Sequence, residues 1–267
     1  MPSHHAPLTA PGYPRALTPV DHVEPVPRRV RAMLGGRMVL DTRDALYLWE
    51  WEPYPQFLIP LQDVDPGALV DEGRTHRLSR GTVTSVGLRA GDVERPGAGR
   101  RYDESRIQQL VGRVRFDWDA LDAWFEEEEQ IFVHPRNPYV RVDALRSSRQ
   151  VRVEKDGVLL AESGATVMVF ETSLPPRYYF DRTAVDFSHL VPSDTVTACP
   201  YKGRTTGYWS VATDDEHHAD LAWSYDFPTR GLEPIAGLIA FYDEKVDVTI
   251  DGVAQARPDT HFARPPA

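Results

Sequence analysis

Residues 30–40 read VRAMLGGRMVL, and residues 151–161, 121 positions later, read VRVEKDGVLLA. The match continues without a gap and keeps glycine, glutamate and proline in step at Gly36 and Gly157, Glu50 and Glu171, and Pro55 and Pro176. Apolar residues on both sides of a glycine are typical of a β-hairpin, and the turn that contains the proline leads into an aromatic strand. The sequence therefore predicts two homologous domains, each built mainly from antiparallel β-strands.

The second halves of the two copies also correspond, with a shifted register. The matching groups are aromatic and apolar: Phe116-Asp117-Trp118 with Tyr225-Asp226-Phe227, then Trp124-Phe125 and Ile131-Phe132-Val133 with Phe241-Tyr242 and Val248-Thr249-Ile250. A loop-prone segment rich in proline, residues 134–138, lies between the copies. We expect a first repeat over residues 28–146 and a second over 147–257, with an extended or disordered lead-in, residues 1–27, and a tail, residues 258–267.

The first copy departs from the second in two stretches. Residues 91–103 are rich in glycine and arginine, which predicts a surface excursion. Within residues 117–129, four apolar side chains recur at helical spacing: Trp118, Leu121, Trp124 and Phe125. This spacing predicts a helix. We interpret its acidic end, residues 126–129, as a solvated face, because adjacent side chains on a helix diverge and do not converge on a cation.

Composition limits the classes of function. The 267 residues carry a formal charge of −10, and phosphate backbones are bound by basic surfaces, so we expect no general nucleic-acid binding. A local basic pocket is compatible with this charge. The single cysteine excludes an internal disulfide and fits a reducing compartment. No apolar run approaches the about 18 residues of a membrane span, and the first residues lack a signal-peptide pattern, so we expect a cytoplasmic protein.

The cysteine lies in the stretch Thr197-Ala198-Cys199-Pro200-Tyr201-Lys202-Gly203, between two runs that are typical of strands. A thiol, an amine and an aromatic ring would therefore meet at a strand end. A free cysteine also commonly packs as a small buried hydrophobe, and this alternative stays open for Cys199. The first copy has Leu78-Ser79-Arg80-Gly81 at this place, so we expect it to lack the site.

Two further groups of residues follow this stretch. Trp223 and Tyr225 alternate along one strand and so share a face, where they would form a core layer or, with Trp209 and Tyr201, the wall of a pocket. Residues 214–218, Asp-Asp-Glu-His-His, are of metal-ligand types. Such residues are also usual at a solvated hairpin tip, so we predict no metal site.

Four motifs of the second repeat carry a family resemblance: residues 199–203, 208–211, 222–225, and the run from Ile235-Ala236-Gly237 to Phe241-Tyr242. They resemble the family called domain of unknown function 427, and the whole chain resembles the tandem form that is common in actinobacteria. The resemblance implies a β-tent fold, in which two sheets lean together around a crevice. Some members are filed as nucleotidyltransferases, but a Gly-Ser followed by spaced aspartates to hold Mg²⁺ and triphosphate is absent here.

Two functions from different classes remain. The first is a module that binds a small anionic or aromatic ligand in a crevice of the second repeat, lined by Cys199, Tyr201, Lys202, Trp209, Trp223 and Tyr225, with Glu171 and Tyr178 on the hairpin side. The second is an enzyme in which Cys199 is a nucleophile or redox thiol, its pKa lowered by Lys202, with His189 as base. The sequence names no cofactor, ligand or oligomeric state.

Overall fold

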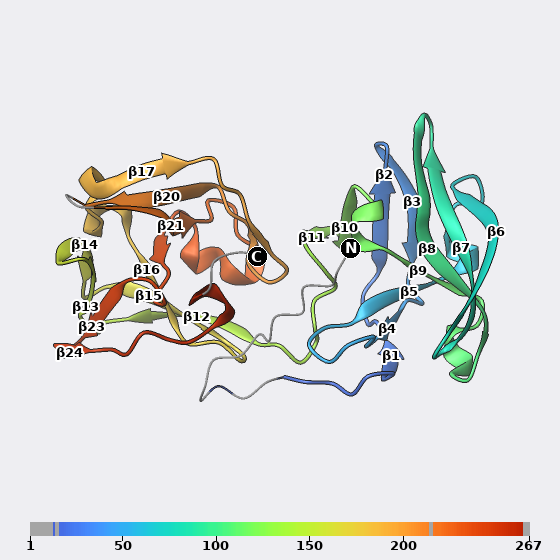
Figure 1. Cartoon of the computed structure of the whole chain (residues 1–267), viewed down its shortest axis with the longest axis horizontal. Coiled ribbons are helices and arrows are strands. Elements are labelled where there is room, and N and C mark those ends of the chain that lie inside the picture. Colours follow the sequence, from blue (N-terminus) through green and yellow to red (C-terminus); the bar gives the residue numbers. More distant parts are fainter. Residues whose placement is uncertain (1–12, 14–15, 214–215, 264–267) are drawn as a thin grey trace. The chain divides into compact units, whose positions relative to one another are not determined.

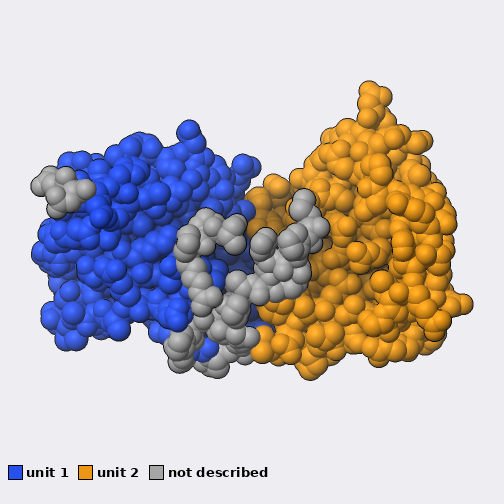
Figure 2. All heavy atoms as spheres, in the orientation of Figure 1, with its two compact units in different colours: residues 1–16, 138–267 blue, residues 17–137 orange. Residues whose placement is uncertain are grey.

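The structure is a computed structural model that describes residue 13, residues 16–213 and residues 216–263. It forms two compact units: an N-terminal unit, residues 17–137, and a C-terminal unit, residues 138–267 together with residues 1–16 (Figure 2). Each unit contains one copy of the repeat. Among the described residues, no helix has both the length and the apolar character needed to cross a membrane.

The N-terminal unit contains two antiparallel sheets (Figure 1). The large sheet has the spatial order β1 (Val23–Pro25), β4 (Leu46–Leu48), β5 (Gln56–Pro60), β9 (Arg113–Phe116), β8 (Val93–Ser105), β7 (Gly81–Ala90) and β6 (Leu69–Leu78). The small sheet has the order β11 (Glu129–Ile131), β10 (Ala123–Glu126), β2 (Val30–Leu34) and β3 (Arg37–Thr42). Three short 3-10 helices connect these strands: η1 (Leu61–Asp63), η2 (Gln108–Leu110) and η3 (Trp118–Ala120).

The C-terminal unit repeats this arrangement. Its large sheet has the order β12 (Val142–Ser147), β15 (Thr166–Glu171), β16 (Arg177–Phe180), β22 (Ile239–Phe241), β21 (His217–Ser224), β20 (Gly207–Ala212) and β17 (Leu190–Ser193). Its small sheet has the order β14 (Val158–Ser163), β13 (Val151–Lys155), β23 (Asp247–Ile250) and β24 (Val253–Ala254). An additional two-stranded ribbon joins β18 (Ala198–Cys199) to β19 (Gly203–Arg204). The 3-10 helices are η4 (Arg182–Ala184), η5 (Phe187–His189), η6 (Arg230–Ile235) and η7 (His261–Ala263).

The first halves of the two repeats correspond residue by residue. Both hairpins have a β-bulge, between Ala32 and Met33 and between Val153 and Glu154. After the hairpins, equivalent isolated bridges form, Leu40 with Val64 and Ala161 with Val185. The hairpin turns need glycine because Gly36 and Gly157 have φ values of 72° and 79°, a left-handed conformation that costs other residues about 1–2 kcal/mol. The prediction of two mainly β domains is confirmed.

Each large sheet has an inner face and an outer face. In the C-terminal unit the inner face packs against the small sheet through a core that includes Tyr178, Phe180 and Phe241. The outer face carries a second core that includes Tyr179 and Trp223. Successive side chains of a strand point to opposite faces, so neighbours in sequence such as Tyr178 and Tyr179 belong to different cores.

The prediction of a helix over residues 117–129 is wrong. The segment forms η3 and then the hairpin of β10 and β11, with Glu127 in the turn at a φ of 54°. Trp118 and Trp124 stack on each other with ring centroids 5.2 Å apart, so their spacing reflects a contact across an irregular loop. The end of this stretch is also not uniformly solvated, because Glu126 is buried and accepts hydrogen bonds from Arg28 at 2.6 Å and Arg136 at 2.9 Å.

The register expected for the second halves is also wrong. Because Ile59 pairs with Val114 as Phe180 pairs with Ile239, Phe116 corresponds to Phe241 and not to Tyr225. Likewise Val30 pairs with Glu126 as Val151 pairs with Ile250, so Trp124 corresponds to Val248. Residues 91–103, expected to be a surface excursion, lie almost entirely in β8.

Edge strands lie outside the repeat limits that we placed from the sequence. Strand β1 falls within the expected lead-in, residues 1–27, yet it pairs with β4. Strand β12 begins at Val142, before the expected boundary near 146, yet it pairs along its whole length with β15 in the C-terminal unit. Within the expected tail, Thr260 is buried. Edge strands pair through their backbones on one side only, so their side-chain pattern is weak.

Candidate functional site

The loop from Cys199 to Gly203 closes the β18–β19 ribbon of the C-terminal unit. Gly203 has a φ of 102°, which only glycine adopts readily, and Cys199 pairs with it across the ribbon. Thr229 fixes the loop from outside, because its hydroxyl donates to the Tyr201 carbonyl at 2.6 Å and its amide donates to the Lys202 carbonyl at 3.0 Å. The loop residues thus have a defined place beside the sheet.

Three of the predicted site residues come together there. The Lys202 ammonium forms an ion pair with Glu171 at the end of β15, and the two side chains are only 13% and 12% exposed. The Cys199 Sγ lies 3.9 Å from Lys202 Nζ. Burial alone would lower the pKa of Lys202, but the nearby Cys199 and Glu171 outweigh burial and raise it above its usual value. Lys202 is therefore a constant positive charge.

The thiol does not have the electrostatics expected of a nucleophile. Burial raises the pKa of Cys199, and Glu171 raises it further, whereas Lys202 and two backbone N–H groups lower it only in part. The expectation that Lys202 depresses the thiol pKa below its ordinary value is therefore wrong. The reason is that burial of the thiol outweighs the ammonium charge of Lys202, and the carboxylate of Glu171 opposes that charge further.

This pKa gives a direct prediction for alkylation of Cys199, the only thiol of the chain. We expect slow labelling by iodoacetamide at neutral pH, with a rate that rises only above about pH 8.5, the ordinary pKa of cysteine. The rate against pH can be followed by intact mass. Half-maximal reactivity below about pH 7.5 would contradict this expectation and restore the thiolate hypothesis.

Tyr179, which the sequence analysis did not select, also faces this loop. It is fully buried, and among the described residues no group accepts a hydrogen bond from its hydroxyl. The indole of Trp223 packs edge-on to its ring. Burial raises the pKa of Tyr179 to about 12, and the positive charge of Lys202 opposes this rise. The alternation along β16 could have identified it, because Tyr179 shares the outer face and Tyr178 does not.

The predicted aromatic residues do not form one wall. Trp223 and Tyr225 are buried in the outer core, at 7% and 5% exposure. Tyr178 belongs to the inner core, and Trp209 packs against that same core while contacting Phe187. The single crevice drawn from the sequence is therefore wrong for Tyr178 and Trp209, which lie on the opposite face from Lys202.

Two other predicted residues have contacts of their own. Tyr201 is partly buried and contributes its carbonyl to the contact with Thr229. His189, considered as a base, lies in η5 with its Nε2 3.9 Å from Asp186. Its geometry is that of a local surface pair within one turn of chain.

A buried ion cluster occupies the outer face beside the loop, and the sequence analysis missed it. Arg177 donates two hydrogen bonds to Glu244, at 2.9 and 3.0 Å, and lies 3.5 Å from Asp243. The guanidinium also lies 5.6 Å from the ring centroid of Trp223. Thr260 from the C-terminal segment donates to Glu244 at 2.6 Å. The cluster ties β16, the residues after β22 and the C-terminal segment together.

The N-terminal unit retains part of this chemistry. Glu50, the counterpart of Glu171, lies 3.9 Å from Arg80, which comes from the β6–β7 turn, and 3.3 Å from Arg115 in β9. The first repeat therefore lacks the cysteine and the lysine but not a carboxylate paired with cations. The expectation that it simply lacks the site is incomplete.

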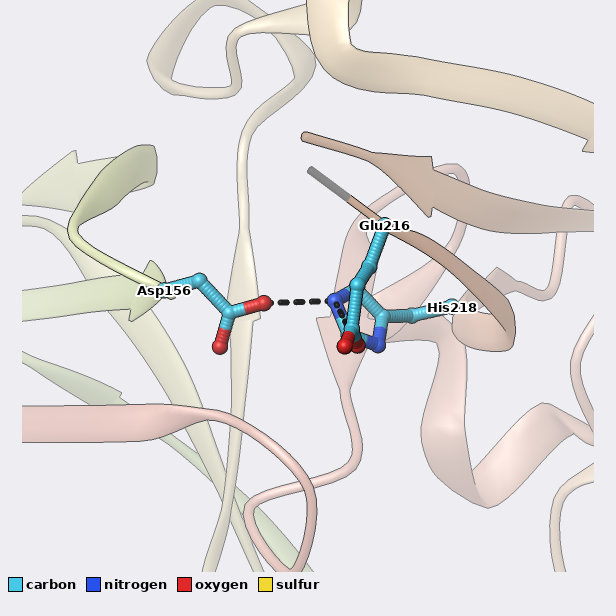
Figure 3. Close-up of side chains that lie close together, drawn as sticks. All are labelled: Asp156, Glu216 and His218. Carbon is cyan, nitrogen blue, oxygen red and sulfur yellow. Dashed lines mark hydrogen bonds and ion pairs between the residues drawn. The ribbon is translucent and has the colours of Figure 1, made fainter. Parts of the chain in front are cut away.

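The acidic and histidine-rich tip contributes to a second cluster (Figure 3). His218 Nε2 lies 2.6 Å from Asp156 in the β13–β14 turn and 3.8 Å from Glu216. These ligand-type atoms all lie within 4.8 Å of one another. Asp156 is also paired with Lys155 at 2.9 Å, and both carboxylates are well exposed, so a surface ion-pair network accounts for these contacts. Asp214 and Asp215 of the same tip lie outside the described residues.

Comparison with known proteins agrees with the repeat. Two regions, residues 22–127 and 143–252, match the family model described as Domain of unknown function (DUF427), one in each unit. No curated protein matches the chain. Because the two matched regions together cover most of the sequence, the chain belongs to the DUF427 family and carries two copies of its domain.

Proposed function

We propose that the protein binds a small ligand at Lys202 on the outer face of the C-terminal unit, through an anionic or other oxygen-rich group. The observation that carries this proposal is a surplus of hydrogen-bond donors. An ammonium has three N–H donors, and among the described residues that of Lys202 has two acceptors, one carboxylate and one weakly accepting sulfur, which leaves one donor over. Within the described part of the chain, the buried hydroxyl of Tyr179 is a further donor without an acceptor.

Unpartnered polar groups in a protein interior are costly, by about 1–3 kcal/mol each. A ligand oxygen that accepts from both Lys202 and Tyr179 would remove this cost. Trp223, which packs edge-on to Tyr179 with ring centroids 6.4 Å apart, supplies an apolar surface beside the donors. An aromatic or apolar body attached to the anionic group therefore suits the site.

The alternative function, an enzyme that uses Cys199 with Lys202, receives less support. A nucleophilic cysteine needs a thiolate, and burial raises the pKa of Cys199. Lys202 is protonated by its contacts and so is no base. We therefore favour binding over catalysis.

The test is a thermal-shift screen of the full chain against carboxylates, phosphates and aromatic acids. A ligand at a hundred times its dissociation constant should stabilise the C-terminal unit by about 2.7 kcal/mol. The double variant Lys202→Met, Glu171→Gln removes the ion pair without leaving a lone buried charge, and it should abolish the shift.

The matched control is the double variant Lys155→Met, Asp156→Asn in the same unit. Lys155 has the same 13% exposure as Lys202 and also pairs with a carboxylate, at 2.9 Å. This variant should keep the full shift. A ligand whose stabilisation survives in the Lys202 and Glu171 variant would show that binding takes place elsewhere.

A further inference from the structure

The outer face of the N-terminal unit contains a groove of about 650 Å³. It lies over β6, β7 and β8, and its polar lining consists of Thr75, His76, Arg77, Ser85, Arg100 and Asp117. Residues 75–77 belong to the first repeat, which the sequence analysis expected to lack a counterpart of the Cys199–Gly203 site.

Strand register explains why this face is hollow in one unit and filled in the other. Ser85 pairs with Arg100, which pairs with Arg115. The equivalent row of the C-terminal unit is Tyr208, Trp223 and Ala240. A serine thus replaces a buried tyrosine, and an arginine replaces a buried tryptophan. At the third position of the row, Arg115 replaces the smaller Ala240, but it pairs with Glu50 and Asp117. The groove lies where the C-terminal unit has its two large rings.

The lining of the groove has more arginines than carboxylates. Arg77 and Arg100 are exposed, and within the described parts of the chain neither side chain has a hydrogen bond or ion pair. Asp117, the one carboxylate of the lining, is already paired with Arg115. His76 lies 3.1 Å from the Ser85 hydroxyl. Two unpaired guanidinium groups thus flank a set of hydroxyl and imidazole donors.

We propose that this groove binds a small molecule through a phosphate group. Guanidinium groups donate two parallel hydrogen bonds to phosphate oxygens, and charge-assisted bonds of this kind are the strong ones. A phosphate offers more acceptor positions than a carboxylate, which matches a lining with Arg77, Arg100, His76 and Ser85. The site is separate from Lys202, so it goes beyond the function proposed for the C-terminal unit.

The test uses pyrophosphate as the probe and the full chain in calorimetric titration at low ionic strength, where the attraction is least screened. Arg100→Gln should weaken binding at least about tenfold, because it removes a charge-assisted contact. Ser85→Tyr restores the residue type of the other repeat and should abolish binding by filling the groove. Arg37→Gln, an exposed arginine of β3 outside the groove, is the control and should bind within about twofold of wild type.

Circular dichroism shows whether each variant is folded. If Ser85→Tyr does not fold, Arg100→Gln alone tests whether the groove binds pyrophosphate. Saturable binding that both groove variants reduce and Arg37→Gln keeps would support the proposal. No saturable heat at millimolar pyrophosphate would overturn it, as would equal binding by all variants. Citrate that binds more tightly than pyrophosphate would overturn the phosphate class. The Lys202 and Glu171 variant should leave this binding unchanged, so the two proposals fail independently.

Discussion

An Arg177→Met variant is expected to lose about 3–5 kcal/mol of unfolding free energy in the C-terminal unit, because the change leaves two buried carboxylates without their cation. The Arg177 and Asp243 side chains are each 9% exposed, and that of Glu244 is fully buried. Burial raises the pKa of Asp243, and the bonds from Arg177 keep the pKa of Glu244 below its usual range despite its burial. Urea unfolding with hydrogen exchange read on β16 and β22 measures the loss in this unit.

The matched control is Arg152→Met in β13. Arg152 also contacts two carboxylates, Glu154 at 2.8 Å and Glu162 at 3.2 Å, but on the solvated surface. Exposed pairs of this kind contribute little, so exchange in the C-terminal unit should stay close to wild type. Exchange in the N-terminal unit, where Gln56 takes the place of Arg177, should not change. An Arg177→Met protein as stable as the Arg152 control would disprove the role of the cluster.

The sequence predicted the first half of each repeat well because its signals are local. Each hairpin has a glycine at positive φ, Gly36 or Gly157, between alternating apolar residues. These signals depend only on neighbouring residues and not on the rest of the chain. The second halves could not be aligned in the same way. Strands β6, β7 and β8 have 10, 10 and 13 residues, whereas β17, β20 and β21 have 4, 6 and 8. Because of these different lengths, matching the residue types aligned the end of β9 with the end of β21, one strand before its true counterpart β22.

The candidate site was predictable only where its chemistry is continuous in the sequence. Cys199 and Lys202 lie in one loop, and Glu171 was marked by the repeat. Arg177 and Glu244 are 67 positions apart and meet only through sheet pairing, so no local pattern indicates them. The misplaced residues, Tyr178 and Trp209, are sequence neighbours of Tyr179 and Tyr208, and one step along a strand changes the face.

Acidification from pH 7.5 to pH 5 is expected to increase the contribution of Asp243 to the unfolding free energy of the C-terminal unit, because the buried carboxylate becomes protonated. Burial raises the pKa of Asp243 to about 6, whereas an aspartate in the unfolded chain has a pKa of about 3.9. The folded state therefore binds the proton more tightly. The stability from this proton is fully present below about pH 4 and is lost as the pH rises through 6, about 3 kcal/mol in all.

Other groups titrate in the same window, so the comparison must isolate one side chain. Burial lowers the pKa of His261, so the unfolded chain takes up that proton first, and this opposes the effect of Asp243 as the pH falls. Asp243→Asn keeps His261 and fixes position 243 in a neutral form. The difference in unfolding free energy between wild type and Asp243→Asn then reports the charge at position 243, together with its coupling to Arg177 and Glu244, and cancels the contribution of His261.

At pH 7.5 Asp243→Asn should be the more stable protein, by up to about 3 kcal/mol, because wild type then holds a buried charged carboxylate that also lies beside Glu244. The difference should shrink as the pH falls through about 6 and approach zero only below about pH 4, where Asp243 is protonated in both the folded and the unfolded chain. Urea unfolding of the two proteins across this range, with exchange read on β22, gives the difference directly. A difference that does not change with pH, or a less stable asparagine variant at pH 7.5, would mean that Arg177 stabilises both carboxylates in their charged form.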